Sequence, residues 1–427
     1  MIKRYVFGTP LETDAVLNKP AACRDKPPYL GKCENALIYK MDEEDIVYGL
    51  GENVRGMNKR GWIYESNCTD DPVHLEETKS LYGAHNFILV SGEKQFGLFL
   101  DTPGKVVFDI GYTNSSQLKI TLEDGDYELY LIDGGTPDDI ITWFRELIGP
   151  SYLPPKWAFG FGQSRWSYAS SEEVRKVAAR YRENHIPLDS IYLDIDYMER
   201  YKDFTIDREA FPDFEQLAED MKQQGIHLVP IIDGGVKIED GYDVYEEGVK
   251  NGFFCKDEDG DDFVVGVWPG KCHFPDMLDE KARAWFGDKY KFLLDKGIEG
   301  FWNDMNEPAI FYSEKRLKKV FEKLEEYRKM NLDVNTFFEF QDLVSTISKN
   351  PEDYRSFYHT YKGKRIRHDK VHNLFGYFMT RSAGEAFERL EPDKRILMFS
   401  RASYIGMHRY GGIWTGDNKS WWSHILL

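Results

Sequence analysis

The fold of this chain is decided by the stretch Ile191-Tyr-Leu-Asp-Ile-Asp-Tyr-Met198, in which a short apolar run ends in two acids. Residues 191–194 have the length and composition of a buried strand. A helix is predicted on either side of it, the first from a capping box formed by Ser170 and Glu173 and the second over residues 214–224. A strand between two helices is typical of the βα units of a parallel sheet.

The same alternation continues along residues 151–427. Further helices are predicted at 279–296 and 371–390, and further strands at 158–163, 227–232, 300–304, 396–400 and 412–415. The sequence has no Gly-x-Gly-x-x-Gly turn and no phosphate-binding loop, which disfavours a nucleotide-binding sheet. We therefore predict a (β/α)8-type barrel in which about six βα units are present. A highly charged segment at about 312–370 is predicted to be an inserted helical subdomain.

Residues 1–150 have a different pattern, with short apolar runs and frequent turn residues. Five strands are predicted there, at 87–90, 96–100, 106–110, 118–122 and 127–132. This spacing is typical of an antiparallel sandwich. Gly149-Pro150 and Pro154-Pro155 mark a junction. The predicted fold class is therefore α/β with an all-β N-terminal domain, a β-sandwich at 1–150 followed by an incomplete barrel at 151–427.

Composition and charge exclude several classes of protein. The 427 residues are 41% hydrophobic and 30% charged, as in an ordinary globular chain. Lys and Arg number 55 and Asp and Glu 73, and the net charge of −18 argues against nucleic acid or an anionic membrane as a partner. No apolar run is long enough for a bilayer span or a signal peptide, and the five cysteines are scattered. We expect a cytoplasmic protein without disulfides, in which Cys255 and Cys272 are packing residues.

Acidic side chains follow four of the predicted strands. They are Asp194 and Asp196, Asp233, Asp304 and Glu307, and Asp417. A single Asp after a strand is ordinarily the N-cap of the next helix, but four such positions interleaved with Trp302, Trp414 and Arg401 are hard to explain as caps. Because the carboxyl ends of barrel strands meet at one face, we expect these side chains to share a pocket.

Two kinds of chemistry use such a cluster of carboxylates. In glycoside hydrolysis one carboxylate attacks the anomeric carbon while another, held protonated, donates to the leaving oxygen. In phosphoryl chemistry the carboxylates would bind Mg²⁺. Aromatic residues make up 15% of the chain, a content that by itself is better explained by a well-filled core. The sequence offers no Lys or glycine-rich cradle near the acids, and the neighbouring Trp residues suit a sugar better than a hydrated metal ion. These features favour the sugar.

Five motifs, in order along the chain, resemble the signatures of glycoside hydrolase family 31. They are Pro154-Pro-Lys-Trp-Ala158; Leu193-Asp-Ile-Asp-Tyr-Met198 with Asp203-Phe-Thr205 and Phe211-Pro212; Val267-Trp-Pro-Gly270; Trp302-Asn-Asp-Met-Asn-Glu-Pro308; and Arg401 leading to Trp414-Thr-Gly-Asp-Asn418. The resemblance covers about residues 40–427 and is most specific in the barrel. It departs at Asp233, which is followed by two glycines where the family usually has proline.

The resemblance implies a role for each matching residue. Asp304 resembles the family's nucleophile and Asp417 its general acid/base, and the two carboxyl groups would lie about 5–5.5 Å apart in a retaining enzyme. Asp194 matches the residue that hydrogen-bonds the sugar, and Arg401 the residue that contacts both the sugar and the acid/base. Four further residues match the family's pocket walls: Trp268, Trp302, Met305 and Trp414. Asp70 lies in a segment that resembles the loop by which the family's N-terminal sandwich reaches into the pocket.

The activity implied by the resemblance is that of a retaining, exo-acting α-glucosidase acting on a small carbohydrate. Ile195 follows Asp194 as in α-glucosidases, whereas members that act on α-xylosides tend to carry Cys-Phe there. No metal and no organic cofactor are expected, and the oligomeric state is open, a homodimer being one option. Two alternatives stay open. One is an α-xylosidase or sulfoquinovosidase; the other is a non-catalytic sugar-binding fragment, because strands seven and eight are not found and the chain is predicted to be C-terminally truncated.

Overall fold

The computed structural model describes residues 1–419 and 421–426 of the chain. Contacts between residues divide the chain into two compact units. The first comprises Met1–Tyr152, Lys370–Tyr377 and the C-terminal segment from Ser400, and the second comprises Leu153–Asp369 and Phe378–Phe399. Among the described residues no helix is both long and apolar enough to cross a membrane.

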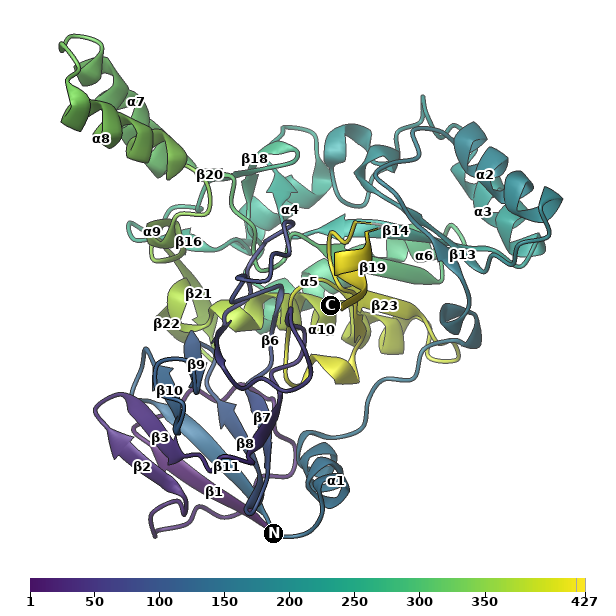
Figure 1. The fold of residues 1–427 in the computed structure, drawn as a ribbon. Helices are drawn as coiled ribbons and strands as arrows, with labels where there is room; N and C mark the ends of the chain where they lie inside the picture. Colours follow the sequence, from purple (N-terminus) through teal and green to yellow (C-terminus); the bar gives the residue numbers. More distant parts are fainter. Residues whose placement is uncertain (420, 427) are drawn as a thin grey trace. The chain divides into compact units, whose positions relative to one another are not determined.

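Two antiparallel five-stranded sheets form the body of the first unit (Figure 1). One has the order β1 (Ile2–Phe7), β11 (Tyr127–Asp133), β8 (Gln95–Asp101), β7 (Phe87–Ser91) and β4 (Ile46–Gly49). The other has the order β2 (Leu30–Cys33), β3 (Ala36–Lys40), β10 (Gln117–Leu122), β9 (Val106–Ile110) and β5 (Trp62–Ser66). Side chains from both sheets form one buried core. The predicted sandwich is confirmed, and β7 to β11 end within one residue of their predicted bounds.

Segments from the far end of the chain complete this unit. Strand β24 (Ser403–Tyr404) pairs in parallel with β6 (Gly83–Ala84). The Tyr404 hydroxyl donates to Asp101 Oδ1 at 3.0 Å, and Arg409 Nη1 donates to two backbone carbonyls of the N-terminal part. The same unit contains helix α1 (Pro137–Ile148), strand β25 (Gly412–Ile413) and the short 3-10 helices η5 (His372–Leu374), η6 (Met407–Arg409) and η7 (Trp422–Leu426).

The second unit contains the parallel strands of the predicted barrel. Their order is β12 (Gly162–Gln163), β13 (Ser190–Leu193), β14 (His227–Asp233), β19 (Gly300–Asp304) and β23 (Leu397–Ser400). Between them lie α2 (Ser171–Glu183), α3 (Phe214–Gln223), α4 (Asp243–Asn251), α5 (Glu280–Lys289), α6 (Lys291–Leu294) and α10 (Phe375–Leu390). The alternation confirms the predicted barrel-type fold, and the sixth predicted strand is present as β25.

Four predicted elements differ from the observed ones. The strand predicted at 412–415 comprises only Gly412–Ile413, β25. Residues 156–159 form a 3-10 helix, η1 (Lys156–Phe159), so of the strand predicted at 158–163 only Gly162 and Gln163 pair as a strand, β12. The predicted helix at 279–296 is divided at Tyr290 into α5 and α6. The helix predicted from 371 begins at Phe375, because the side chain of Asn373 accepts from the backbone of Cys68 and donates to the Gly104 carbonyl.

The insertion at 312–370 is helical only in its first part. Helices α7 (Glu314–Tyr327) and α8 (Val334–Ser345) form a hairpin that extends away from the parallel strands of the same unit (Figure 1). After α9 (Pro351–Tyr354), strand β21 (Phe357–Tyr361) pairs with β16 (Lys256–Asp257) on one side and with β22 (Lys364–Arg367) on the other. A second small sheet has the order β15 (Val236–Lys237), β18 (Gly270–His273), β17 (Val265–Val267) and β20 (Tyr312–Ser313).

Candidate active site

Asp304 is the last residue of β19 and only 8% exposed. The backbone N–H of Met305 donates to Asp304 Oδ1 at 2.7 Å. Met305 itself is buried and has a φ of 54°, a left-handed conformation that is uncommon for a non-glycine residue. This turn sets the direction of the Asp304 carboxylate directly after the strand.

Trp302, two residues earlier, connects β19 to the end of β13. Its indole Nε1 donates to the Leu193 carbonyl at 3.2 Å, and the side chain is buried. Asp194 follows Leu193, and its Oδ1 accepts the N–H of Ile195 at 2.8 Å. Asp194 is therefore the N-cap of the 3-10 helix η2 (Ile195–Tyr197), and Ile195 is buried beneath it. The structure thus brings Trp302 next to the strand end that carries Asp194.

Trp268 lies at the tip of the β17–β18 hairpin and is 42% exposed. Its ring packs edge-on against Phe311 with centroids 4.9 Å apart, and Trp166 lies 6.0 Å away at a tilt. Trp166 is more exposed still. An exposed indole in an aromatic group suits a surface that stacks on a sugar ring, and sequence reasoning identified Trp268 but not its two neighbours.

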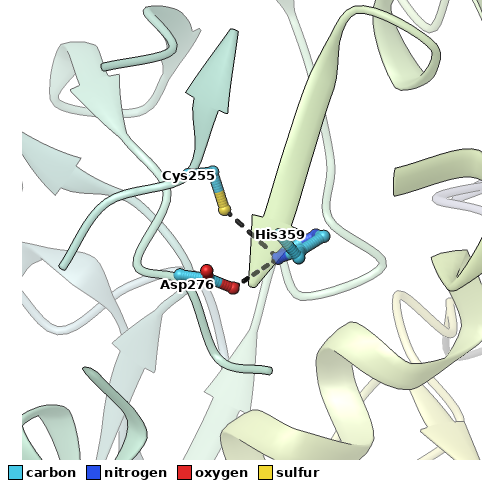
Figure 2. Close-up of side chains that lie close together, drawn as sticks. All are labelled: Cys255, Asp276 and His359. Carbon is cyan, nitrogen blue, oxygen red and sulfur yellow. Dashed lines mark hydrogen bonds and ion pairs between the residues drawn. The ribbon is translucent and has the colours of Figure 1, made fainter. Parts of the chain in front are cut away.

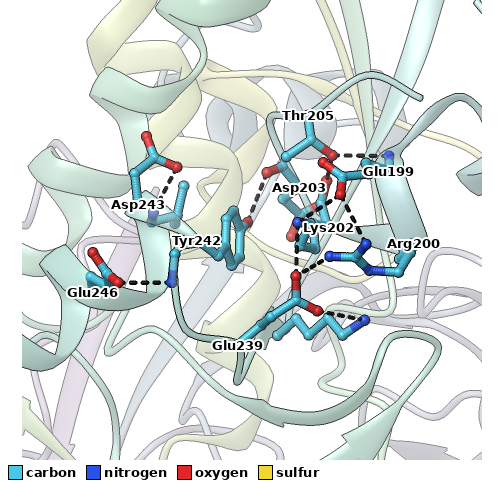
Figure 3. A network of polar contacts seen from close by, with 12 residues as sticks. Glu199, Arg200, Lys202, Asp203, Thr205, Glu239, Tyr242, Asp243 and Glu246 are labelled. Carbon is cyan, nitrogen blue, oxygen red and sulfur yellow. Dashed lines mark hydrogen bonds and ion pairs between the residues drawn. The ribbon is translucent and has the colours of Figure 1, made fainter. Parts of the chain in front are cut away.

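A charged network fixes the loop that follows Asp194 (Figure 3). Lys202, whose side chain is 7% exposed, lies 3.0 Å from Glu239 Oε1 and 3.3 Å from Glu199 Oε1. Arg200 and Lys237 also contact Glu239. Hydrogen bonds from Arg200 and then Lys202 lower the pKa of Glu239 to about 2. Glu239 therefore stays ionised and ties this loop to the segment after β14.

Asp203 ties the same loop to β14 itself. Its Oδ1 accepts the N–H of Asp233 at 2.8 Å. The Tyr242 hydroxyl donates to the Asp203 carbonyl at 2.7 Å (Figure 3). Burial raises the pKa of Asp203 well above its usual value. Arg200, Tyr201 and Phe204 all have positive φ angles. The loop is thus held in an uncommon backbone conformation by contacts with residues that lie about 30 to 40 positions later in the sequence.

In the first unit, Arg401 lies between two carboxylates. Its side chain is 2% exposed, with Nη1 3.5 Å from Asp417 Oδ2 and Nη2 3.6 Å from Asp70 Oδ1. The guanidinium stands 4.9 Å from the centre of the Tyr82 ring. The structure therefore brings together three of the predicted residues, one from the N-terminal part and two from the C-terminal segment.

Tyr82 is a further residue that sequence reasoning missed. Its hydroxyl lies 3.3 Å from Asp417 Oδ2 and 2.9 Å from the Asp71 carbonyl, and it accepts the Asp417 N–H at 3.4 Å. Burial, with the charge of Asp417 as a second cause, raises the pKa of Tyr82, so the hydroxyl keeps its proton. The signal for this contact is Gly416, because a Cβ there would lie 2.0 Å from Tyr82 Cε2.

The predicted site residues thus fall into two groups, each described within its own unit. The side chain of Asp417 is 46% exposed. The backbone N–H of Trp414 donates to the Ser400 carbonyl at 3.4 Å. The first unit holds Asp70, Arg401, Trp414 and Asp417, and the second holds Asp194, Ile195, Trp268, Trp302, Asp304 and Met305. The separation expected between Asp304 and Asp417 stays a prediction.

Family models and known proteins agree with this architecture. The model of the glycosyl hydrolases family 31 TIM-barrel domain matches residues 151–426, and that of the glycosyl hydrolase 31 N-terminal galactose mutarotase-like domain matches residues 24–109. The chain belongs to glycosyl hydrolase family 31. Its membership confirms the resemblance carried by the five motifs.

Relatives of this family 31 chain include alpha-glucosidase 2 of Bacillus thermoamyloliquefaciens, which is 38% identical over 91% of this chain and 45% of its own length. An alpha-glucosidase of Saccharolobus solfataricus is 30% identical over 91% of this chain and 53% of its own length. A solved family 31 alpha-glucosidase from Bacteroides thetaiotaomicron superposes with a TM-score of 0.71 at 28% identity, over 90% of this chain and 57% of that one. The chain spans about half the length of these curated relatives.

Proposed function

We propose that this family 31 chain carries the active site of a retaining, exo-acting α-glucosidase. The substrate would be an oligosaccharide with α-linked glucose at its non-reducing end. The observation that carries the proposal is Asp304, a buried carboxylate at the carboxyl end of a parallel strand, oriented by a backbone donor. Two relatives across 91% of the chain are named alpha-glucosidases, which supports glucose as the sugar.

In the proposed reaction, Asp304 attacks the anomeric carbon while Asp417 gives its proton to the departing glycosidic oxygen. The product is a β-glucosyl ester of Asp304 and a shortened sugar. Asp417, now ionised, accepts a proton from a water molecule as the oxygen of that water attacks the same carbon; the ester bond to Asp304 breaks, and α-glucose leaves with Asp304 restored. Arg401 and Tyr82, which contact Asp417, would hold this carboxyl in place through both steps.

Sugar recognition is assigned to the other predicted residues. Asp194 offers a carboxylate at the neighbouring strand end for the sugar hydroxyls, and Arg401 a guanidinium. Trp302 would form a wall of the pocket, and the exposed Trp268 a stacking face farther along the substrate.

The five cysteines are all free, which supports the proposal that the protein works in a reducing compartment.

Azide rescue tests the two catalytic roles separately. Asp304→Ala and Asp417→Ala should each lower hydrolysis of p-nitrophenyl α-glucoside by at least about 10². Azide added to Asp304→Ala should attack the substrate directly and give β-glucosyl azide. Azide added to Asp417→Ala should attack the covalent intermediate and give α-glucosyl azide. Exchanged products, or near-normal rates in either variant without azide, would contradict the assignment.

The sugar itself is tested with a panel of p-nitrophenyl glycosides. The α-glucoside should have the highest kcat/KM. A preference for the α-xyloside or for an aryl α-sulfoquinovoside would move the chain to another activity of the same family. If the chain binds maltose but turns over no substrate, the proposal of catalysis is wrong and the chain is a sugar-binding protein.

A further inference from the structure

Three buried side chains that are good metal ligands meet in the second unit, apart from the acids of the proposed mechanism. Cys255 precedes β16, Asp276 follows β18, and His359 lies within β21. Figure 2 shows the side chains of Cys255 and Asp276 directed at one edge of the His359 ring. Cys255 Sγ lies 3.4 Å and Asp276 Oδ1 2.8 Å from His359 Nδ1. One ligand atom of each residue lies within 4.8 Å of the other two.

A catalytic triad of the cysteine-hydrolase type does not explain this cluster. In such a triad the thiol contacts one nitrogen of the imidazole and the carboxylate contacts the other, so that the ring passes a proton between them. Here both Cys255 and Asp276 approach the same nitrogen, Nδ1. The thiol is also only 1% exposed, out of reach of a substrate. Convergence of S, O and N atoms on one point is instead the geometry of a metal site.

The surroundings of the cluster orient its members as the outer contacts of a metal site do. His359 Nε2 lies 2.9 Å from His368 Nδ1, so its Nε2–H can donate there while Nδ1 faces Cys255 and Asp276. The second oxygen of Asp276 accepts the N–H of Thr360 at 2.6 Å. Metal-binding imidazoles and carboxylates ordinarily have such a partner on the atom that faces away from the ion.

Charge balance favours a divalent ion. The side chains of His359 and Asp276 are 0% and 7% exposed, so an uncompensated charge there is costly. A thiolate, a carboxylate and a neutral imidazole carry two negative charges together, which a divalent cation neutralises.

We propose that Cys255, Asp276 and His359 bind one divalent transition-metal ion, for which Zn²⁺ is the best match to this mixed S, O and N ligand set. Bonds of about 2.0–2.3 Å at tetrahedral angles place neighbouring ligand atoms roughly 3.3–3.6 Å apart. The Sγ–Nδ1 separation of 3.4 Å already fits, and the Oδ1–Nδ1 separation of 2.8 Å must open by about 0.5 Å as the ion replaces the shared proton. The Pro275 carbonyl, 3.6 Å from Cys255 Sγ, is in reach as a fourth ligand.

The site would be structural. Cys255 and Asp276 belong to the long connection between β14 and β19, whereas His359 belongs to the insertion at 312–370. An ion held by all three would join these two segments of the second unit and stabilise the folded chain by mass action. His359 follows Cys255 by 104 residues, so the site has no short spacing motif by which it could be predicted from the sequence. This explains why Cys255 was predicted from the sequence to be only a packing residue.

Cobalt substitution tests the proposal without any measurement of activity. The full chain is freed of metal with a chelator under reducing conditions and titrated with Co²⁺. We expect one equivalent to produce the near-ultraviolet charge-transfer band of a thiolate–cobalt bond, and Zn²⁺ to abolish it by displacement. Cys255→Ser and His359→Ala should lose the band. Cys272→Ser is the matched control, because Cys272 is equally buried but lies outside the one such ligand group found among the described residues, and it should keep the band.

Two further variants keep the test decisive where Cys255→Ser does not fold. Asp276→Asn retains an acceptor for the Thr360 N–H, and it should keep the band at saturating Co²⁺ with affinity at least about 10-fold lower. His368→Gln should leave the band unchanged and weaken affinity about 10–100-fold, as a positioning residue does. Absence of the band from the folded native chain, a band that survives Cys255→Ser, or native affinity in Asp276→Asn would overturn the proposal.

Discussion

Gly416 allows Asp417 to lie against Tyr82, and Gly416→Ala should separate them. The glycine has a φ of 73°, and a Cβ built on it would stand 2.0 Å from Tyr82 Cε2 and 2.5 Å from Cζ. Carbon atoms in contact are about 3.5–4.0 Å apart, so the loop and the ring must move apart by roughly 1.5 Å. The ring is fully buried, so the loop is the part that moves. The Tyr82–Asp417 hydrogen bond, already 3.3 Å long, should then be lost.

Two separate effects follow, and their sizes differ. A side chain with positive φ costs about 1–2 kcal/mol of folding free energy at any such position. Misplacing a catalytic group by about 1 Å costs roughly 10²-fold in rate. We therefore expect Gly416→Ala to lower kcat by about 10² or more and the free energy of unfolding by only a few kcal/mol. The loss should be larger on maltose than on p-nitrophenyl α-glucoside, because a poor leaving group depends more on the general acid.

Gly225→Ala is the matched control for this experiment. Gly225 has a φ of 71°, and nothing lies within 4 Å of the added Cβ. It therefore carries the same backbone cost without the collision. Steady-state kinetics and chemical denaturation of both variants separate the effects, since only Gly416→Ala should lose kcat. Equal kcat in the two variants would refute the idea that the close approach of Gly416 to Tyr82 positions Asp417.

Three more outcomes are expected. Tyr82→Phe keeps the buried ring but removes the hydroxyl, so kcat on maltose should fall about tenfold while unfolding free energy changes by about 1 kcal/mol; an unchanged kcat would exclude the hydroxyl from positioning Asp417. Burial raises the pKa of Asp101 to about 6, above the roughly 3.9 of an unfolded chain. The native state therefore holds this proton more tightly than the unfolded chain does. The free energy of unfolding should fall by up to about 3 kcal/mol as pH rises from about 4 to 6 and should stay level above pH 6. Chemical denaturation at a series of pH values should show this fall in the native chain and not in Asp101→Asn, which keeps an acceptor for the Thr13 and Tyr404 hydroxyls. Glu239→Gln removes the negative charge that pairs with buried Lys202 and should loosen the loop after Asp194. We therefore expect KM to rise by a larger factor than kcat falls. Unchanged kinetics would show that this network does not support the sugar site.

Local signals explain which elements could be predicted. Strands β7 to β11 are short, mostly apolar runs separated by turn residues, so their bounds follow from neighbouring residues alone. The start of α10 could not be predicted, because Asn373 is held by Cys68 and Gly104, hundreds of residues away in the chain. Tyr82 was missed for the same reason, since its contact with Asp417 joins residues 335 positions apart. Only Gly416 leaves a local trace of that contact.

In the candidate acids, a capping hydrogen bond is compatible with the catalytic role proposed above. Asp304 is the last residue of β19 and Asp194 directly follows β13, and each accepts the N–H of the next residue with Oδ1, at 2.7 and 2.8 Å. Sequence reasoning weighed an N-cap against a functional acid as competing interpretations of such positions. The hydrogen bond that makes Asp194 a cap also fixes its side-chain torsions, and the same bond fixes those of Asp304. A carboxylate whose first oxygen is held by its own backbone presents the second in one direction, and a fixed direction is what attack on a single carbon atom requires.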